Sequence, residues 1–197
     1  KQRLDDLRLG SLAQMFGVAK PVIGMVHLWP LPGSPGYTGY GMGTILDHAL
    51  RDADALLEGG VDGLVVENMW DLPYYVAGDV QLEAVTAQAV AARKVKERAG
   101  RPVGVNVIHN GWRAELSIAI AAGLDFMRVC ILTGARLWDT GDLDRGCAAD
   151  LLRKRKELGA EGVRLFADVD KKHSLPFPGR DLATHIEWTG FYGADAL

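Results

Sequence analysis

The sequence has 197 residues, of which 48% are hydrophobic and 24% charged, proportions typical of one globular domain and not of a disordered chain. Lysine and arginine total 22 against 25 acidic residues, and the resulting net charge of −3 argues against binding to a nucleic-acid backbone. No apolar run approaches the roughly 20 residues of a membrane span, and the charged N-terminus does not resemble a signal peptide. We therefore expect one cytoplasmic domain, residues 1–197, without a nucleic-acid partner or a membrane span.

Short apolar runs alternate along the chain with segments of helical periodicity. The first run, 21–28, is β-branched and is followed by proline and glycine, features that predict a buried strand. Similar runs predict strands at 63–68, 102–108, 126–131 and 163–168, and 193–197 resembles the start of a sixth. Helical spacing predicts helices at about 44–57, 80–99, 112–122, 144–158 and 182–189.

This strict alternation predicts an α/β fold with a parallel sheet and right-handed crossovers. An open doubly wound sheet and a TIM (βα)8 barrel both satisfy it. No G-x-G-x-x-G motif follows the first strand, which disfavours a dinucleotide-binding sheet. A barrel needs eight units and about 250 residues. The sequence supplies five units and the start of a sixth, so it predicts either an open sheet or part of a barrel.

Ionisable and amide side chains are predicted to gather at one edge of the sheet. On each strand the apolar alternate positions suit the helix layer, so the intervening residues face the other way. By this rule Glu67, Asn106, Arg128 and Asp168 point inward near the ends of four strands, and His27 lies on the same face of the first. Barrel active sites form at this end, so the cluster predicts a functional site. A structural ion network around Arg128 would produce the same pattern.

The sequence contains no recognisable metal motif. His27, Asp168 and His173 could supply ligands, but no H-x-H or H-E-x-x-H spacing supports a site. Cys130 and Cys147 form neither a metal pair nor a disulfide framework. We therefore expect neither a metal nor a cofactor.

Several short motifs follow one another in a specific order. PVIGMVHL at 21–28 and LPGSP at 31–35 are followed by GGVDG at 59–63 and Glu67-Asn68. The later motifs are GVNV at 104–107, FMR at 126–128, TGA at 133–135, and ADV at 167–169 with Lys172-His173. From residue 20 to the end, the chain resembles the BtpA/SgcQ family. The resemblance implies a TIM barrel of the ribulose-phosphate-binding type, of which this sequence holds the first five to six βα units.

The inward cluster predicts an enzyme that applies acid/base chemistry to a small sugar-like or phosphorylated metabolite, as an isomerase, epimerase or lyase does. Asp168 with Lys172 or His173 would form the acid/base pair, and Glu67 would be a second base. Lys172 and His173 could equally belong to a solvated loop. The expected substrate-binding residues are His27, Asn68, Asn106 and Arg128.

One branch of the family is named for photosystem I biogenesis, which implies a second hypothesis: a non-catalytic assembly factor with photosystem I partners. Aromatic residues in the first two strand-end loops would anchor such a partner. They are Trp29, Tyr37, Tyr40, Trp70, Tyr74 and Tyr75. The same residues could stack on a sugar or close a dimer, and we expect a homo-oligomer.

Overall fold

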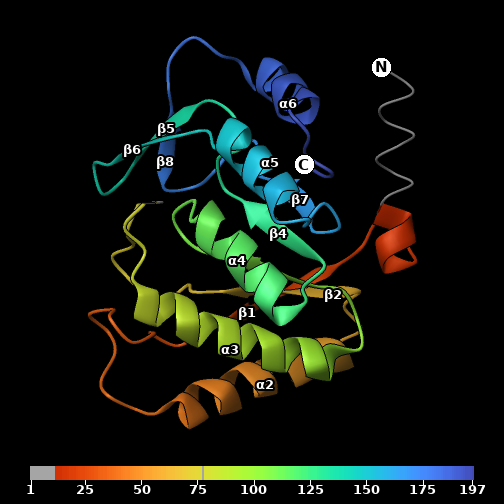
Figure 1. Ribbon diagram of the computed structural model, residues 1–197, viewed down its shortest axis with the longest axis vertical. Helices are drawn as coiled ribbons and strands as arrows, with labels where there is room; N and C mark the ends of the chain where they lie inside the picture. The colour runs from red at the N-terminus through yellow and green to blue at the C-terminus, as the bar shows by residue number, and fades with distance from the viewer. Residues whose placement is uncertain (1–11, 77) are drawn as a thin grey trace.

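A five-stranded parallel sheet forms the centre of the computed structural model, which describes residues 12–76 and 78–197. The strands follow one another across the sheet in chain order (Figure 1). They are β1 (Ile23–His27), β2 (Gly63–Glu67), β3 (Val103–Asn106), β4 (Phe126–Val129) and β7 (Arg164–Ala167). Ala196 forms a parallel bridge with Phe166, so a sixth strand begins beside β7. Each of the five predicted strands is confirmed within its predicted range and is one to three residues shorter.

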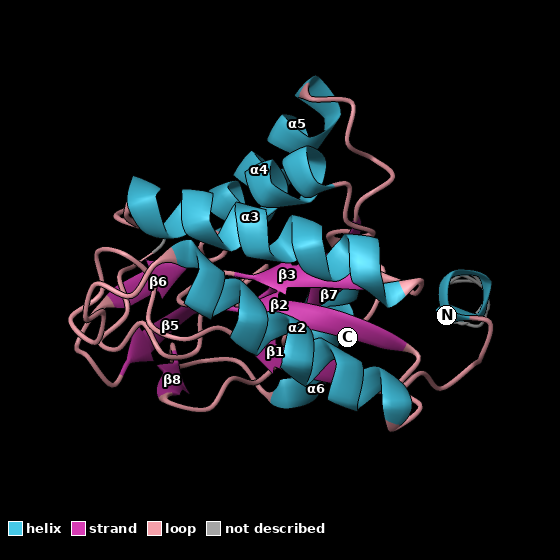
Figure 2. Cartoon of the chain, turned by 90° about the horizontal axis from the view of Figure 1, so that it is seen from below, coloured by secondary structure: helices cyan, strands magenta, loops and turns pink. Residues whose placement is uncertain are grey.

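Helices follow the strands along the chain, and the first three of them contact the parallel sheet. The helices are α2 (Met42–Glu58), α3 (Leu82–Ala99), α4 (Trp112–Ala122), α5 (Ala148–Glu157) and α6 (Leu182–Phe191). Figure 2 shows α2, α3 and α4 lying along the sheet. Val66, Val105 and Leu165 point into this layer and are fully buried against it. The apolar alternate positions of the strands therefore face the helices, as predicted.

The inner face of the sheet is apolar toward the amino ends of the strands. Phe16, Val65 and Phe126 form a buried cluster there, and the rings of Phe126 and Phe166 stack 4.5 Å apart. Gly104 is required at this level because any side chain at its position would overlap the Phe126 ring. Apolar side chains therefore fill this face near the amino ends of the strands, and its polar side chains lie at the carboxyl ends.

A second, antiparallel sheet was not expected from the sequence. It has the order β6–β5–β8, with β5 (Ala135–Trp138), β6 (Leu143–Arg145) and β8 (Ser174–Pro176). β5 and β6 follow the carboxyl end of β4, and β8 follows that of β7 (Figure 1). Because Leu143–Arg145 pairs with β5, the helix predicted from residue 144 begins only at Ala148.

The sequential order of parallel strands, each followed by an outer helix, is the arrangement of a TIM-like fold. The described chain contributes five such strands and the beginning of a sixth. Within the same residues, no helix combines the length and the apolar character needed to cross a membrane.

Candidate functional site

A cavity of about 660 Å³ lies at the carboxyl ends of the parallel strands. His27, Glu67, Arg128 and Lys171 line its polar part. Its apolar part is lined by Met69, Leu72, Tyr74, Ile108 and Trp138. The volume is within the range of about 300–1,000 Å³ that is typical of small-molecule sites.

Charged and imidazole side chains form a continuous chain of contacts beside the cavity, and Asp168 is its one member that does not line the cavity. Both carboxylate oxygens of Glu67 have a neighbour: Oε2 lies 3.3 Å from His27 Nε2, and Oε1 accepts from Arg128 Nη1 at 3.3 Å. Arg128 also contacts Asp168 through Nε and Nη2, both at 3.1 Å. Asp168 Oδ2 is 3.2 Å from Lys171 Nζ. The strand alternation correctly placed four of these five side chains on one face.

The backbone explains why these residues meet. His27 stands opposite Glu67 in the register of β1 and β2, and both are the last residues of their strands. Asp168 follows β7 directly, and its backbone N–H donates to Val129 O on β4. Because parallel strands end at the same edge of the sheet, the terminal side chains of neighbouring strands converge.

Arg128 and Lys171 stay charged because carboxylates surround them. Burial lowers the pKa of Arg128, but the neighbouring Asp168 and Glu67 raise it by more than burial lowers it. The net shift of the pKa is upward. Lys171 is only 8% exposed, and burial lowers its pKa, but the neighbouring Cys130, Asp168 and Glu67 more than reverse that effect. Arg128 and Lys171 thus balance the two carboxylates within a partly dehydrated site.

Asn68 and Asn106 lie behind the cavity wall. Asn106 is fully buried, and its amide nitrogen donates to Glu115 Oε1 at 2.9 Å and to Arg128 O at 2.7 Å. Asn68 Oδ1 accepts from the Ile108 N–H at 2.9 Å. Neither amide lines the cavity, so the structure places both where they position the protein backbone.

Lys172 and His173 lie at the outer rim. Both line the cavity, but the ion pair of His173 is with Asp139, whose Oδ2 is 3.3 Å from Nδ1. The ammonium group that reaches Asp168 belongs to Lys171, which the sequence analysis did not select. The only indication in the sequence was that Lys171 lies three residues after Asp168. A loop has no periodicity from which to predict where a side chain points.

Aromatic side chains form an uncharged part of the cavity lining. The rings of His109 and Trp138 stack 3.8 Å apart, and Tyr74 packs against His109 at 4.9 Å. Burial lowers the pKa of His109 to about 4, so the imidazole is uncharged at neutral pH. Burial, followed by Glu67 and Asp71, raises the pKa of Tyr74 to about 12. Such a wall suits an apolar group or the C–H face of a sugar.

Glu115 on α4 is the second important residue that the sequence analysis missed. It is fully buried, and its Oε1 accepts from Asn106 Nδ2 and from Val107 N. Burial raises its pKa to about 8, so the carboxyl group is protonated at neutral pH. Helical spacing puts it on the same buried face as Ile118 and Ala119, which was the available signal.

Metal ligation has no candidate cluster among the residues that the structure describes. No three or more His, Cys, Asp or Glu side chains there are arranged to hold an ion. The Glu67–Arg128–Asp168–Lys171 arrangement instead contains its own cations, which occupy the carboxylate oxygens.

The sequential parallel sheet, with its cavity and charged side chains at the strand ends, defines an α/β protein with a TIM-like fold. The chain belongs to the BtpA family, whose model matches residues 18–196. The resemblance seen in the sequence motifs is thereby confirmed.

Relatives occur in bacteria, archaea and animals. The chain is 39% identical over 176 residues to the photosystem I biogenesis protein BtpA of Synechocystis, a match that covers 89% of this chain and 60% of that protein. It is 39% identical over 179 residues to an uncharacterized protein of Pyrococcus abyssi, with coverage of 91% and 67%. An uncharacterized mitochondrial protein of Caenorhabditis elegans is 36% identical over 180 residues, with coverage of 88% and 64%. The chain spans about two thirds of the length of these relatives.

Proposed function

We propose that this protein is an enzyme that applies acid/base chemistry to a small sugar-like or phosphorylated metabolite, in a reaction of the isomerase, epimerase or lyase type. The observation that carries the proposal is the ion-paired chain from His27 to Lys171 along one wall of a cavity of small-molecule size. Ionisable groups that converge in a cleft are the usual equipment for proton transfer.

Glu67 and His27 are the acid/base pair in this proposal. Both line the cavity, and the 3.3 Å between Oε2 and Nε2 allows a proton to pass between them. A carboxylate can take a proton from carbon or from a hydroxyl group, and an imidazole nitrogen can donate or accept one.

Arg128 and Lys171 are the groups that stabilise negative charge on the substrate. Proton removal beside a carbonyl group places charge on the carbonyl oxygen, and fixed cations at the cavity wall favour that charge. Asp168 holds both cations in place through contacts of 3.1 and 3.2 Å. In the sequence-based assignment Asp168 was itself an acid or base; here it acts through its two partners.

The two halves of the cavity favour a polyhydroxylated substrate. Hydroxyl groups would meet Glu67 and His27, while C–H groups would pack against Tyr74 and Trp138. Lys172 and His173 stand at the rim, where an ammonium and an imidazole can contact a phosphate or carboxylate substituent.

A thermal-shift panel of aldoses, ketoses and their phosphates tests this proposal. A ligand of the cavity raises the melting temperature of the wild type, and Glu67→Gln should abolish that rise. Asp47→Asn is the matched control, because Asp47 is an exposed carboxylate on α2 outside the cavity. An equal rise in Glu67→Gln, or no rise with any sugar, would contradict the proposal.

The name of the Synechocystis relative favours one alternative, an assembly factor for photosystem I. Trp70 and Tyr75 are about half exposed after β2 and would serve as anchors. Tyr37 and Tyr40 are less available, since the Tyr40 hydroxyl donates to Pro30 O and the Tyr37 hydroxyl to Tyr40 O. Binding of purified photosystem I that is lost in Trp70→Ala would support this alternative.

Homo-oligomerisation and a cytoplasmic location are further parts of the proposal. Light scattering during gel filtration tests the first, and fractionation of the source cell tests the second. Because loops at barrel mouths commonly mediate association, Trp70→Ala should also weaken an oligomer that forms there.

A further inference from the structure

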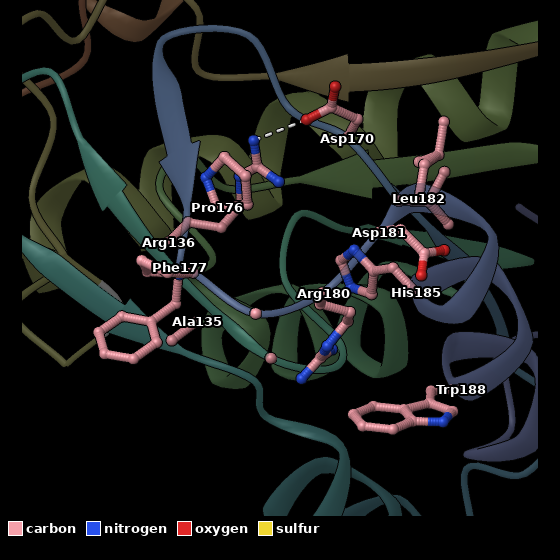
Figure 3. Close-up of a pocket in the computed structure, with 14 residues that line it drawn as sticks. Ala135, Arg136, Asp170, Pro176, Phe177, Arg180, Asp181, Leu182, His185 and Trp188 are labelled. Atoms are coloured by element: carbon pink, nitrogen blue, oxygen red, sulfur yellow. Dashed lines mark hydrogen bonds and ion pairs between the residues drawn. The ribbon is translucent and has the colours of Figure 1, made fainter.

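A second cavity, of about 330 Å³, lies between the small antiparallel sheet and the start of α6 (Figure 3). It is lined by Ala135 and Arg136 from β5, by the loop at 176–181, and by His185 and Trp188 on α6. None of its lining residues lines the cavity at the strand ends. The cavity is therefore a separate space.

Arg180 brings an unpaired charge to this cavity. Among the residues that the structure describes, no carboxylate forms an ion pair with it, and its buried Nη1 has no hydrogen-bond partner. Burying a guanidinium N–H without an acceptor costs free energy, so the protein holds this charge here at a cost.

The nearby carboxylates are already engaged elsewhere. Asp181 caps α6: its Oδ1 accepts from Thr184 N at 2.8 Å, and its Oδ2 accepts from the Thr184 hydroxyl at 2.9 Å. Asp170 Oδ1 lies 2.7 Å from Arg136 Nη2, the contact drawn in Figure 3. Asp181 and Asp170 therefore leave the guanidinium of Arg180 for another partner.

Two neighbours hold Arg180 in place. Its Cζ lies 4.3 Å from the centroid of the Trp188 ring, toward which the side chain extends in Figure 3. Gly134, at φ +81°, makes room for the guanidinium, because a Cβ there would lie 2.8 Å from Nη1. An aromatic ring and a glycine thus fix the guanidinium beside the cavity.

His185 adds a second polar group with a defined orientation. Its Nε2 lies 3.1 Å from Thr133 O, and a carbonyl oxygen can only accept, so Nε2 carries the proton. Its other nitrogen, Nδ1, is then free of a proton and can accept a hydrogen bond from a protonated phosphate.

We propose that this second cavity binds a small oxyanion, a phosphate or carboxylate group, through the guanidinium of Arg180. The planar fork of an arginine matches two oxygens of either group. His185 lies within the same lining and provides the second contact. The ligand is a free metabolite or the anionic substituent of a larger one.

Isothermal titration calorimetry at constant ionic strength tests the proposal, with inorganic phosphate in one series and acetate in the other. The wild type should bind at least one of them saturably at a single site. Arg180→Ala should weaken that binding about tenfold or more, because a charge-assisted contact is lost. Arg113→Ala, at an exposed arginine on α4 outside the cavity, is the charge-matched control and should bind as the wild type does.

Arg180→Lys separates fold from recognition, since it keeps the charge and removes the fork. It should bind more weakly than the wild type and more tightly than Arg180→Ala, and it decides the question if Arg180→Ala does not fold. Preference for phosphate over acetate would identify a phosphate ligand, and the reverse a carboxylate. Equal affinity in wild type and both Arg180 variants, or no saturable binding of either anion to the wild type, would overturn the proposal.

Discussion

Arg128 holds the Asp168 carboxylate with two hydrogen bonds of 3.1 Å, from Nε and Nη2, while its third nitrogen reaches Glu67. One guanidinium thereby links the ends of β2, β4 and β7. The side chain of Glu67 is only 4% exposed, so loss of its partner would leave a carboxylate in a poorly hydrated position. The contact is therefore structural as well as electrostatic.

Replacing Arg128 with methionine should lower the free energy of unfolding by about 2–4 kcal/mol, because two partly buried carboxylates lose the guanidinium that they share. The expected loss of stability is smaller than the largest losses seen for fully buried ion pairs, because the Arg128 side chain is 31% exposed. Urea unfolding measures the change.

Arg98→Met is the control for this prediction. Arg98 also contacts a carboxylate through two nitrogens, each 2.7 Å from Asp54, but both side chains are well exposed. Exposed pairs contribute about 0–1 kcal/mol. Equal losses in the two variants would show that burial does not set the strength of the Arg128 contact.

Glu115→Gln should change how stability depends on pH. The pKa of Glu115 is raised from 4.5 to about 8 in the folded chain, so the folded state holds a proton that the unfolded state releases. The stabilisation is complete below pH 4.5 and is lost as the pH rises through 8. Relative to the wild type, the variant should gain roughly 3 kcal/mol between pH 5 and pH 8.

Urea unfolding of both proteins across that range measures the difference. The two proteins are compared because His109 also makes stability depend on pH, with the opposite sign. Its pKa is lowered, so its contribution to stability is complete above pH 6.5 and is lost as the pH falls toward 4. Since Glu115→Gln leaves His109 in place, that contribution cancels. Parallel curves for the two proteins would mean that Glu115 ionises normally.

The adjacent lysines Lys171 and Lys172 should respond differently to the same substitution. Lys171→Met removes a buried ammonium that contacts Asp168 at 3.2 Å and should cost about 1–3 kcal/mol of stability. Lys172→Met changes an exposed side chain and should stay within about 0.5 kcal/mol. Thermal melting of both variants shows which substitution costs more stability. A larger loss in Lys172→Met than in Lys171→Met would contradict the assignment of Lys171 as the buried partner of Asp168.

The two cysteines of the sequence report directly on packing. Cys130 and Cys147 are 1% and 4% exposed, and burial raises the pKa of both thiols. Ellman's reagent should therefore leave the native protein unmodified over the time in which it modifies both thiols in urea. Rapid reaction of either thiol without denaturant would show that its surroundings are open.

The parallel sheet and the inward cluster could be predicted because both follow from local pattern. Alternation within each strand decides which face a residue takes, and parallel strands end at a common edge. These two rules place His27, Glu67, Arg128 and Asp168 together. They also placed Asn106 in this cluster, but its side chain is buried against Glu115 and does not line the cavity. The pattern needs no knowledge of distant contacts.

The antiparallel sheet could not be predicted because its strands are too short to show a period. β6 and β8 have three residues each, and Leu137 on β5 pairs with Leu175 far along the chain. The direction of Lys171 and the burial of Asn68 depend on loops in the same way. Loop conformation is set by tertiary contacts that a single strand or helix does not encode.

Exchange of substrate protons with solvent tests the central claim most directly. The wild type is incubated in D2O with sugars and sugar phosphates, and proton NMR follows the C–H group beside the carbonyl. We predict exchange with at least one of them, lowered about 100-fold or more in Glu67→Gln and unchanged in Asp47→Asn. Exchange at the wild-type rate in Glu67→Gln, or its absence from every sugar tested, would contradict acid/base catalysis at the strand ends.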